Sequence, residues 1–108
     1  MKTLTFKKKT INGEDVYIDA TGIFIIKKRY PYFKSRPEWD LYAQNHVLNF
    51  KYDRIYNYAF HSKKEIIEEL TSLIDFMDVY TPFCYEFNDE QFNLLRRTYK
   101  EGDKDASN

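Results

Sequence analysis

The first 60 residues alternate between apolar and polar positions in short runs, which is the period of half-buried β-strands. Thr3 to Lys9 is the first such run, and Asn12-Gly13 follows it as a tight turn, because both residue types tolerate a positive φ angle. Val16 to Asp19 alternates again. Ile23 to Ile26 is a continuous apolar run, which predicts a central strand that is buried on both faces.

Two further strands are predicted beyond a loop that contains two prolines. The loop runs from Tyr30 to Glu38, and its prolines exclude regular strand pairing. Trp39 to Ala43 and Arg54 to Phe60 then alternate, whereas Gln44 to Asp53 between them fits neither the strand period nor the helix period. Residues 3–60 therefore predict an antiparallel sheet of four to five strands.

The period changes to that of a helix at Ser62. The segment Ser62-Lys63-Lys64-Glu65 is a capping box, in which serine and glutamate satisfy each other's free backbone N–H groups. Apolar residues then recur at helical spacing, which predicts a long helix over residues 62–80. Asn88-Asp89-Glu90-Gln91 repeats the capping pattern and predicts a shorter helix over residues 88–100. We therefore expect one α+β domain over residues 1–100, with helices packed on the sheet, and a disordered tail over residues 101–108.

Aromatic residues make up 19% of the chain, with ten tyrosines, nine phenylalanines and one tryptophan. This composition excludes an intrinsically disordered chain. A tyrosine hydroxyl needs water or a polar partner, so many of these rings should lie half-buried or at a contact surface. A tyrosine-rich sheet face and a dedicated contact patch both fit the composition.

The formal charge is zero overall but is divided along the chain. Residues 1–64 hold 13 lysines and arginines against 6 carboxylates, a charge of +7, and residues 65–108 carry −7. The sign changes beside the capping box, which predicts a basic sheet and an acidic helical layer. Such a division indicates a partner of one charge sign, or two oppositely charged segments that pack within one fold.

The residues that carry catalysis or metal binding are sparse. His46, His61 and Cys84 are too widely spaced for a zinc site, and the neighbours of Cys84 are aromatic and acidic, which does not favour a reactive thiolate. The three glycines form no phosphate-binding loop. The carboxylates of the long helix fit a solvated face, or alternatively a patch for a hard cation or a basic partner. We expect a non-enzymatic protein without cofactor or metal.

Cys84 is the only cysteine, so no intramolecular disulfide can form and a reducing compartment is indicated. No apolar stretch approaches the roughly 18 residues of a membrane-spanning helix. The first residues lack the apolar run of a signal peptide. A cytoplasmic protein without membrane contact is therefore expected.

Basic and aromatic residues are interleaved around the proline-containing loop, and this region is the predicted partner-binding site. Cations among exposed rings are one way to hold nucleic acid, because the cations neutralise phosphates while the rings stack on bases. Lysines that protect a sheet edge against aggregation are the alternative interpretation. The predicted partner-binding residues are Lys27, Arg29, Tyr30, Tyr32, Phe33, Lys34, Arg36 and Trp39.

Residues 22–74 run as three predicted strands followed by a helix, and the helix starts with the segment Phe60-His61-Ser62-Lys63-Lys64-Glu65. They resemble the arm-type DNA-binding domain of tyrosine integrases, where an aromatic-x-Ser/Thr-Lys-Lys-Glu segment begins the helix after a three-stranded sheet. The resemblance implies a sheet that enters the major groove of DNA.

As a short, aromatic-rich and charge-divided chain, the sequence is also similar to accessory proteins of phages and mobile elements, among them anti-CRISPR proteins and other host-takeover inhibitors. Those proteins are mostly non-enzymatic and occupy a surface of a host or defence protein. This similarity implies a phage-encoded inhibitor in the host cytoplasm that blocks a host defence nuclease, or nuclease complex, by direct protein binding. The alternative is a nucleic-acid-binding module that uses a basic, aromatic sheet face. The sequence predicts no oligomeric state.

Overall fold

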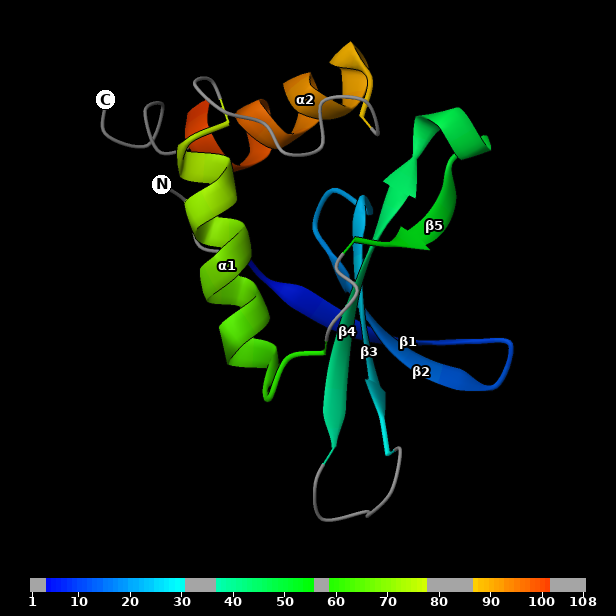
Figure 1. The fold of residues 1–108 in the computed structure, drawn as a ribbon. Coiled ribbons are helices and arrows are strands. Elements are labelled where there is room, and N and C mark those ends of the chain that lie inside the picture. The colour runs from blue at the N-terminus through cyan, green and yellow to red at the C-terminus, as the bar shows by residue number, and fades with distance from the viewer. Residues whose placement is uncertain (1–3, 31–36, 56–58, 78–86, 102–108) are drawn as a thin grey trace.

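The computed structural model describes residues 4–30, 37–55, 59–77 and 87–101. Five strands form one antiparallel sheet in chain order, and the two helices lie on the same side of it (Figure 1). The strands are β1 Phe6–Ile11, β2 Glu14–Asp19, β3 Phe24–Arg29, β4 Glu38–Asn45 and β5 Lys51–Arg54. The predicted α+β class, with a long and a shorter helix packed on an antiparallel sheet, is confirmed.

The helices begin at the two predicted caps. α1 spans Lys63–Asp75, and the Ser62 hydroxyl accepts a hydrogen bond of 3.2 Å from the Glu65 backbone N–H. α2 spans Asp89–Leu95 after a complete capping box, and the chain continues as π-helical turns over Arg96–Glu101. α1 ends earlier than predicted, because Phe76 already leaves the helical conformation. A 3₁₀ helix, η1 His46–Leu48, lies between β4 and β5.

The fifth strand differs from its predicted range. β5 ends at Arg54, where the prediction began, and Phe60 forms an isolated antiparallel bridge with Trp39. Apart from Arg54, the residues of β5 are exposed, so this edge strand lacks the alternation of apolar and polar residues that marks a half-buried strand. Residues 56–58 of the predicted strand lie outside the described residues.

The strand register divides the sheet into two faces, because directly paired residues of antiparallel strands point to the same side. One face, here called the covered face, shares the main core with α1 and carries Tyr17, Phe24, Ile26, Trp39, Leu41 and Ala43. The opposite face, here called the open face, carries Val16, Ile18, Ile25, Lys27, Arg29, Asp40, Tyr42 and Arg54. Residues 23–26 are all buried, which confirms the central strand predicted to be buried on both faces.

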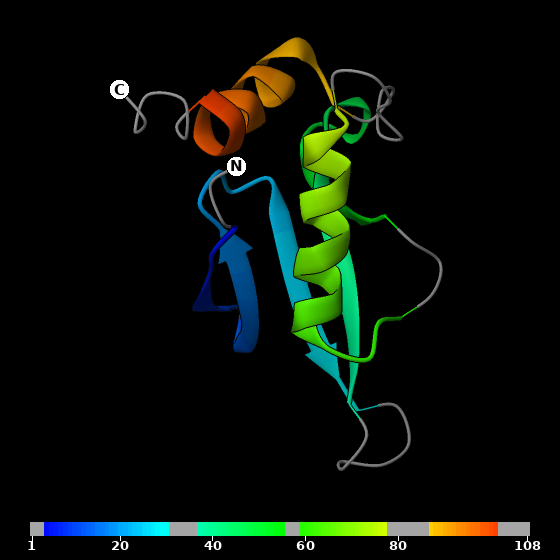
Figure 2. The same ribbon diagram turned by 90° about the vertical axis from the view of Figure 1, so that its left-hand side faces the viewer.

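The helices cover only part of the covered face. α1 lies along β3 and β4, and α2 crosses the end of the sheet near the C-terminal end of α1 (Figure 2). The other end of β3 and β4 extends beyond the first turn of α1 (Figure 1). Buried Ile66, Leu70 and Ile74 form the apolar stripe that α1 turns toward the sheet.

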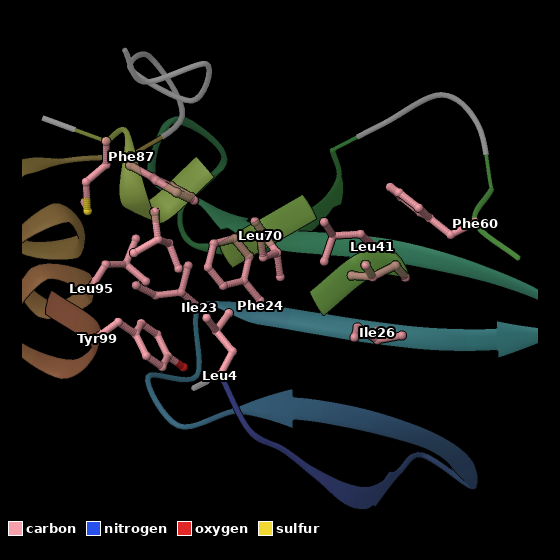
Figure 3. Packing of buried hydrophobic residues seen from close by; sticks show 14 residues of the cluster. Leu4, Ile23, Phe24, Ile26, Leu41, Phe60, Leu70, Phe87, Leu95 and Tyr99 are labelled. Atoms are coloured by element: carbon pink, nitrogen blue, oxygen red, sulfur yellow. The ribbon is translucent and has the colours of Figure 1, made fainter. Parts of the chain in front are cut away.

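A buried carboxylate joins the sheet to the C-terminal helical turns. Asp19 is only 4% exposed, and its Oδ1 accepts a hydrogen bond of 2.9 Å from the Phe24 backbone N–H. Its Oδ2 accepts from the backbone N–H and the hydroxyl of Thr21, at 3.1 and 2.6 Å. The Tyr99 hydroxyl also donates to Oδ2, at 2.6 Å. Figure 3 shows Tyr99 reaching from its helix into the apolar cluster beside Ile23 and Leu4.

Burial raises the pKa of Tyr99 far above the ordinary value of a tyrosine, and the adjacent Asp19 raises it further. The Tyr99 hydroxyl therefore keeps its proton and remains a hydrogen-bond donor over the whole pH range in which proteins are stable. A donor that is 80 residues away in sequence thus satisfies the carboxylate that organises the turn before β3.

We predict that Tyr99→Phe lowers the free energy of unfolding by roughly 1.5 to 3 kcal/mol, because it removes a buried hydrogen bond to a charged group. Tyr52→Phe is the matched control. It removes a hydrogen bond of the same length, 2.6 Å to the Gly22 carbonyl, at an exposed position. The control should cost less than about 1 kcal/mol, because water can replace the lost donor. Urea unfolding followed by circular dichroism measures both variants, and equal losses would contradict the role given to Asp19.

Candidate functional site

Half of the residues predicted to bind a partner lie in the described part of the chain. Lys27 and Arg29 belong to β3, Tyr30 directly follows it, and Trp39 belongs to β4. The other four, whose role stays a prediction, lie outside the described residues: Tyr32, Phe33, Lys34 and Arg36.

The structure does not bring the described four residues together. Lys27 and Arg29 point to the open face with Asp40, whereas Trp39 points to the covered face with its direct partner Lys28. The predicted basic and aromatic group is therefore split between two surfaces of the sheet.

Carboxylates of the open face compensate the cations of β3 that the sequence singled out. Lys27 Nζ lies 3.6 Å from a carboxylate oxygen of Glu14. Arg29 contacts Glu38 at 2.8 Å and Asp40 at 2.6 Å, and hydrogen bonding to Asp40 raises the pKa of the arginine.

Arg54 of β5 approaches the same aspartate from the other side. Its guanidinium contacts Oδ1 of Asp40 at 2.9 Å, so the buried Asp40 carboxylate lies between two arginines. Lys7 and Lys9 of the edge strand β1 stay exposed on this face, which fits the protection of a sheet edge. The centre of the open face is thus a mutually paired set of charges.

A second group of cations and rings lies on the covered face, at the end that α1 leaves open. We call it the lysine–aromatic cluster, and it consists of Tyr17, Lys28, Tyr30, Trp39 and Lys63. Lys28 Nζ lies 5.2 Å from the ring centroid of Tyr30 and 5.3 Å from that of Trp39. Lys63 Nζ lies 4.6 Å from the centroid of Tyr17, whose ring is 5.9 Å from the Trp39 ring. Hydrogen bonding to the Tyr30 side chain raises the pKa of Lys28, so its ammonium stays charged.

A third surface feature is an apolar tip between β4 and β5, formed by Val47, Leu48 and Phe50. These side chains are 67%, 46% and 46% exposed, respectively. The tip stands at the end of the sheet that lies near α2 (Figure 1). It is the densest group of large exposed apolar side chains along the described sequence.

The backbone of the apolar tip is fixed by Asn45. The Asn45 side-chain oxygen accepts a hydrogen bond of 3.0 Å from the Val47 N–H, and the Asn45 backbone carbonyl accepts one of 2.9 Å from the Phe50 N–H. Asn49 and Phe50 both have positive φ angles, 57° and 62°. Asparagine tolerates this conformation, but for a bulky residue such as phenylalanine it is strained. The fold thus holds three apolar side chains in solvent on a defined and partly strained backbone.

The carboxylates of α1 cap the helix and line a surface hollow. Glu65 completes the helix cap by accepting a hydrogen bond of 2.9 Å from the His61 N–H. A hollow of about 480 Å³ beside the helix is lined by Glu65, Glu68 and Glu69 together with Phe60 and His61. In the described ranges, no three His, Cys, Asp or Glu side chains come together in a way that could hold a metal ion. Cys84 lies outside these ranges.

The sequence interpretation missed the apolar tip because residues 44–53 fit neither period. A signal was present, since Asn45 and Asn49 flank a short apolar segment, and asparagine favours both a helix N-cap and the left-handed conformation. Lys28 and Lys63 were also missed as a pair, because they are 35 positions apart and only the packing of α1 on the sheet brings them to one cluster.

Comparisons with known proteins give no match, either to a protein-family model, to a curated protein or to a solved structure. Among the described residues, neither helix combines the length and the apolar character that a membrane-spanning segment needs.

The left-handed conformation of Asn49 leads to a prediction about the tip. Asn49→Val should lower the free energy of unfolding by roughly 1 to 2 kcal/mol, because a β-branched residue clashes with its own carbonyl at this φ angle. Asn49→Gly, the matched control, should leave the stability unchanged or slightly higher. Chemical denaturation measures both variants, and equal stability of the two would show that the turn does not hold this conformation.

Proposed function

We propose that the protein acts by binding another protein, and that its apolar tip enters a pocket of that partner. The observation that carries the proposal is the exposure of Val47, Leu48 and Phe50 on a backbone that Asn45 fixes in a strained conformation. Exposed apolar groups of this kind mark interaction sites, and backbone strain in native proteins gathers where function requires it.

The geometry of the tip favours a protein partner. Its side chains already stand in place, so binding costs little conformational entropy of the backbone, which is the main advantage of a preorganised contact. Large side chains that fill a partner pocket carry most of the binding energy of an interface. The matching surface is a concave, apolar pocket with a polar rim.

Within this proposal, the partner is a host defence nuclease or nuclease complex, and binding inhibits it without catalysis. The support for this narrower choice is the similarity of the chain to phage accessory proteins, which act by occupying a surface. Inhibition of a purified nuclease at one-to-one stoichiometry is its direct test.

The alternative, a nucleic-acid-binding module that uses the basic open face, is less favoured. Glu14, Glu38 and Asp40 already compensate Lys27 and Arg29 there. A phosphate at the centre of this face would have to displace these carboxylates before it could bind.

The proposal is tested by photo-crosslinking in the cell of origin, with benzoylphenylalanine placed at Phe50 or at the control position Ile11. Ile11 is 41% exposed, nearly as much as Leu48, but lies on the β1–β2 hairpin. A defined partner protein should crosslink from position 50 and not from position 11. Equal crosslinking from both positions would contradict the proposal.

The purified partner then allows a quantitative measurement. Leu48→Asp should weaken its binding about 30-fold or more, the effect of losing a hot-spot residue, whereas Ile11→Asp should change it less than about threefold. Unchanged binding of the Leu48→Asp variant would exclude the tip as the contact.

A further inference from the structure

Several cations of the sheet, and Lys63 at the start of α1, differ in what compensates them. Lys8, Lys27, Arg29 and Arg54 each lie within 3.6 Å of a carboxylate. Lys28 and Lys63 lie over aromatic rings, as Lys27 does over Tyr42 at 4.9 Å, but within the described residues no carboxylate forms an ion pair with Lys28 or Lys63. A cation over an exposed ring is only weakly stabilised, so these ring contacts do not replace an ion pair.

The two described carboxylates that flank the rings of the cluster in sequence are occupied or face away. Asp15, which flanks Tyr17 on the covered face, accepts a hydrogen bond from the Thr10 hydroxyl at 2.8 Å and pairs with Lys8. Glu38, which flanks Trp39, points to the open face and binds Arg29. An anionic ligand therefore reaches Lys28 and Lys63 without displacing a carboxylate of the described residues.

The rings of the cluster are accessible as well. Tyr30 is 49% exposed, and Trp39 and Tyr17 are half-buried. Their spacing places flat aromatic surfaces beside each ammonium. Aromatic rings beside cations that have no ion pair are complementary to a polymer in which flat aromatic groups alternate with anionic groups.

We infer that the lysine–aromatic cluster is a binding site for single-stranded nucleic acid. In the bound state, phosphates form ion pairs with Lys28 and Lys63, whose ammonium groups move off the aromatic rings. The ring faces of Tyr30 and Trp39 then stack on bases. A single strand fits better than a duplex, because only unpaired bases can be splayed onto rings. This site is separate from the apolar tip and does not depend on the proposed protein partner.

Trp39 provides a direct readout, because it is the only tryptophan of the chain and part of the site. The full chain is titrated with oligothymidylate of about 12 nucleotides, a length within the range of about 4 to 16 nucleotides that single-strand-binding folds cover. The same sequence as a duplex and inorganic polyphosphate serve as comparisons. Stacking on Trp39 should quench its fluorescence with oligothymidylate, whereas polyphosphate should give weaker binding without quenching.

The salt dependence of the binding affinity reports how many phosphates the protein contacts. Two lysine contacts to a single strand predict a slope of about −1.4 for the logarithm of affinity against the logarithm of salt concentration. Lys28→Ala should reduce this slope by about 0.7. Lys27→Ala is the matched control, since the neighbouring lysine points to the other face and pairs with Glu14, and it should leave the slope unchanged.

The stacking contribution is tested at Tyr30, which follows β3 and is exposed. Tyr30→Ala should weaken oligothymidylate binding at least about fivefold, whereas Tyr30→Phe, which keeps the ring, should bind like the unmodified chain. Leu48→Asp at the apolar tip should leave this binding intact, which separates the two proposals.

Three results would overturn the inference. The first is the absence of oligothymidylate binding at about 50 mM salt. The second is an equal loss of binding in the Lys27→Ala and Lys28→Ala variants. The third is a preference for duplex or polyphosphate over the single strand, since this would leave only a nonspecific attraction between opposite charges.

Discussion

The Asp19 carboxylate lies at the point where three parts of the fold meet, and it joins them by accepting hydrogen bonds from Thr21, Phe24 and Tyr99. It ends β2, it holds the turn that leads into β3 through Thr21 and Phe24, and it receives the Tyr99 hydroxyl from the C-terminal helical turns. A buried carboxylate without these donors would be costly, because it has lost its hydration. The position of the C-terminal helix is therefore coupled to the geometry of the central hairpin.

The surface features follow from where this anchor holds the helices. Tyr99 fixes the C-terminal turns beside the β2–β3 turn, and Gln91 fixes the start of α2 by donating to the Gln44 carbonyl at 3.0 Å. Both contacts lie toward the same end of the sheet (Figure 1). Toward the opposite end of the covered face, the lysine–aromatic cluster lies at the first residue of α1. Gln44 directly precedes Asn45, so the same contact supports the base of the apolar tip.

The sequence predicts those parts of the structure that depend on local pattern. The two capped helix starts, the Asn12-Gly13 turn and the doubly buried central strand each follow from a few neighbouring residues, and all are present. The acidic character of α1 and the basic character of the strands are equally local properties. The residue that each charged side chain contacts depends on the tertiary fold, and the sequence alone did not predict these contacts.

Strand register explains why the candidate site could be predicted only in part. Lys27 and Lys28 are adjacent and chemically identical, yet one pairs with Glu14 on the open face and the other lies over Trp39 on the covered face. A shift of the register by one residue would exchange their roles. The apolar tip escaped prediction for a different reason, since its order comes from asparagine side chains and not from a repeating pattern.

Backbone hydrogen exchange at Phe24 tests the central role of Asp19 most directly. The Phe24 N–H is held by the Asp19 carboxylate and not by a strand partner, so its protection reports the stability of this junction. If the junction opens only when the whole domain unfolds, the Phe24 amide should exchange at the same free energy as the Ile26 amide in the middle of β3. Exchange of the Phe24 amide at a free energy well below that of Ile26 would show local opening and contradict the account.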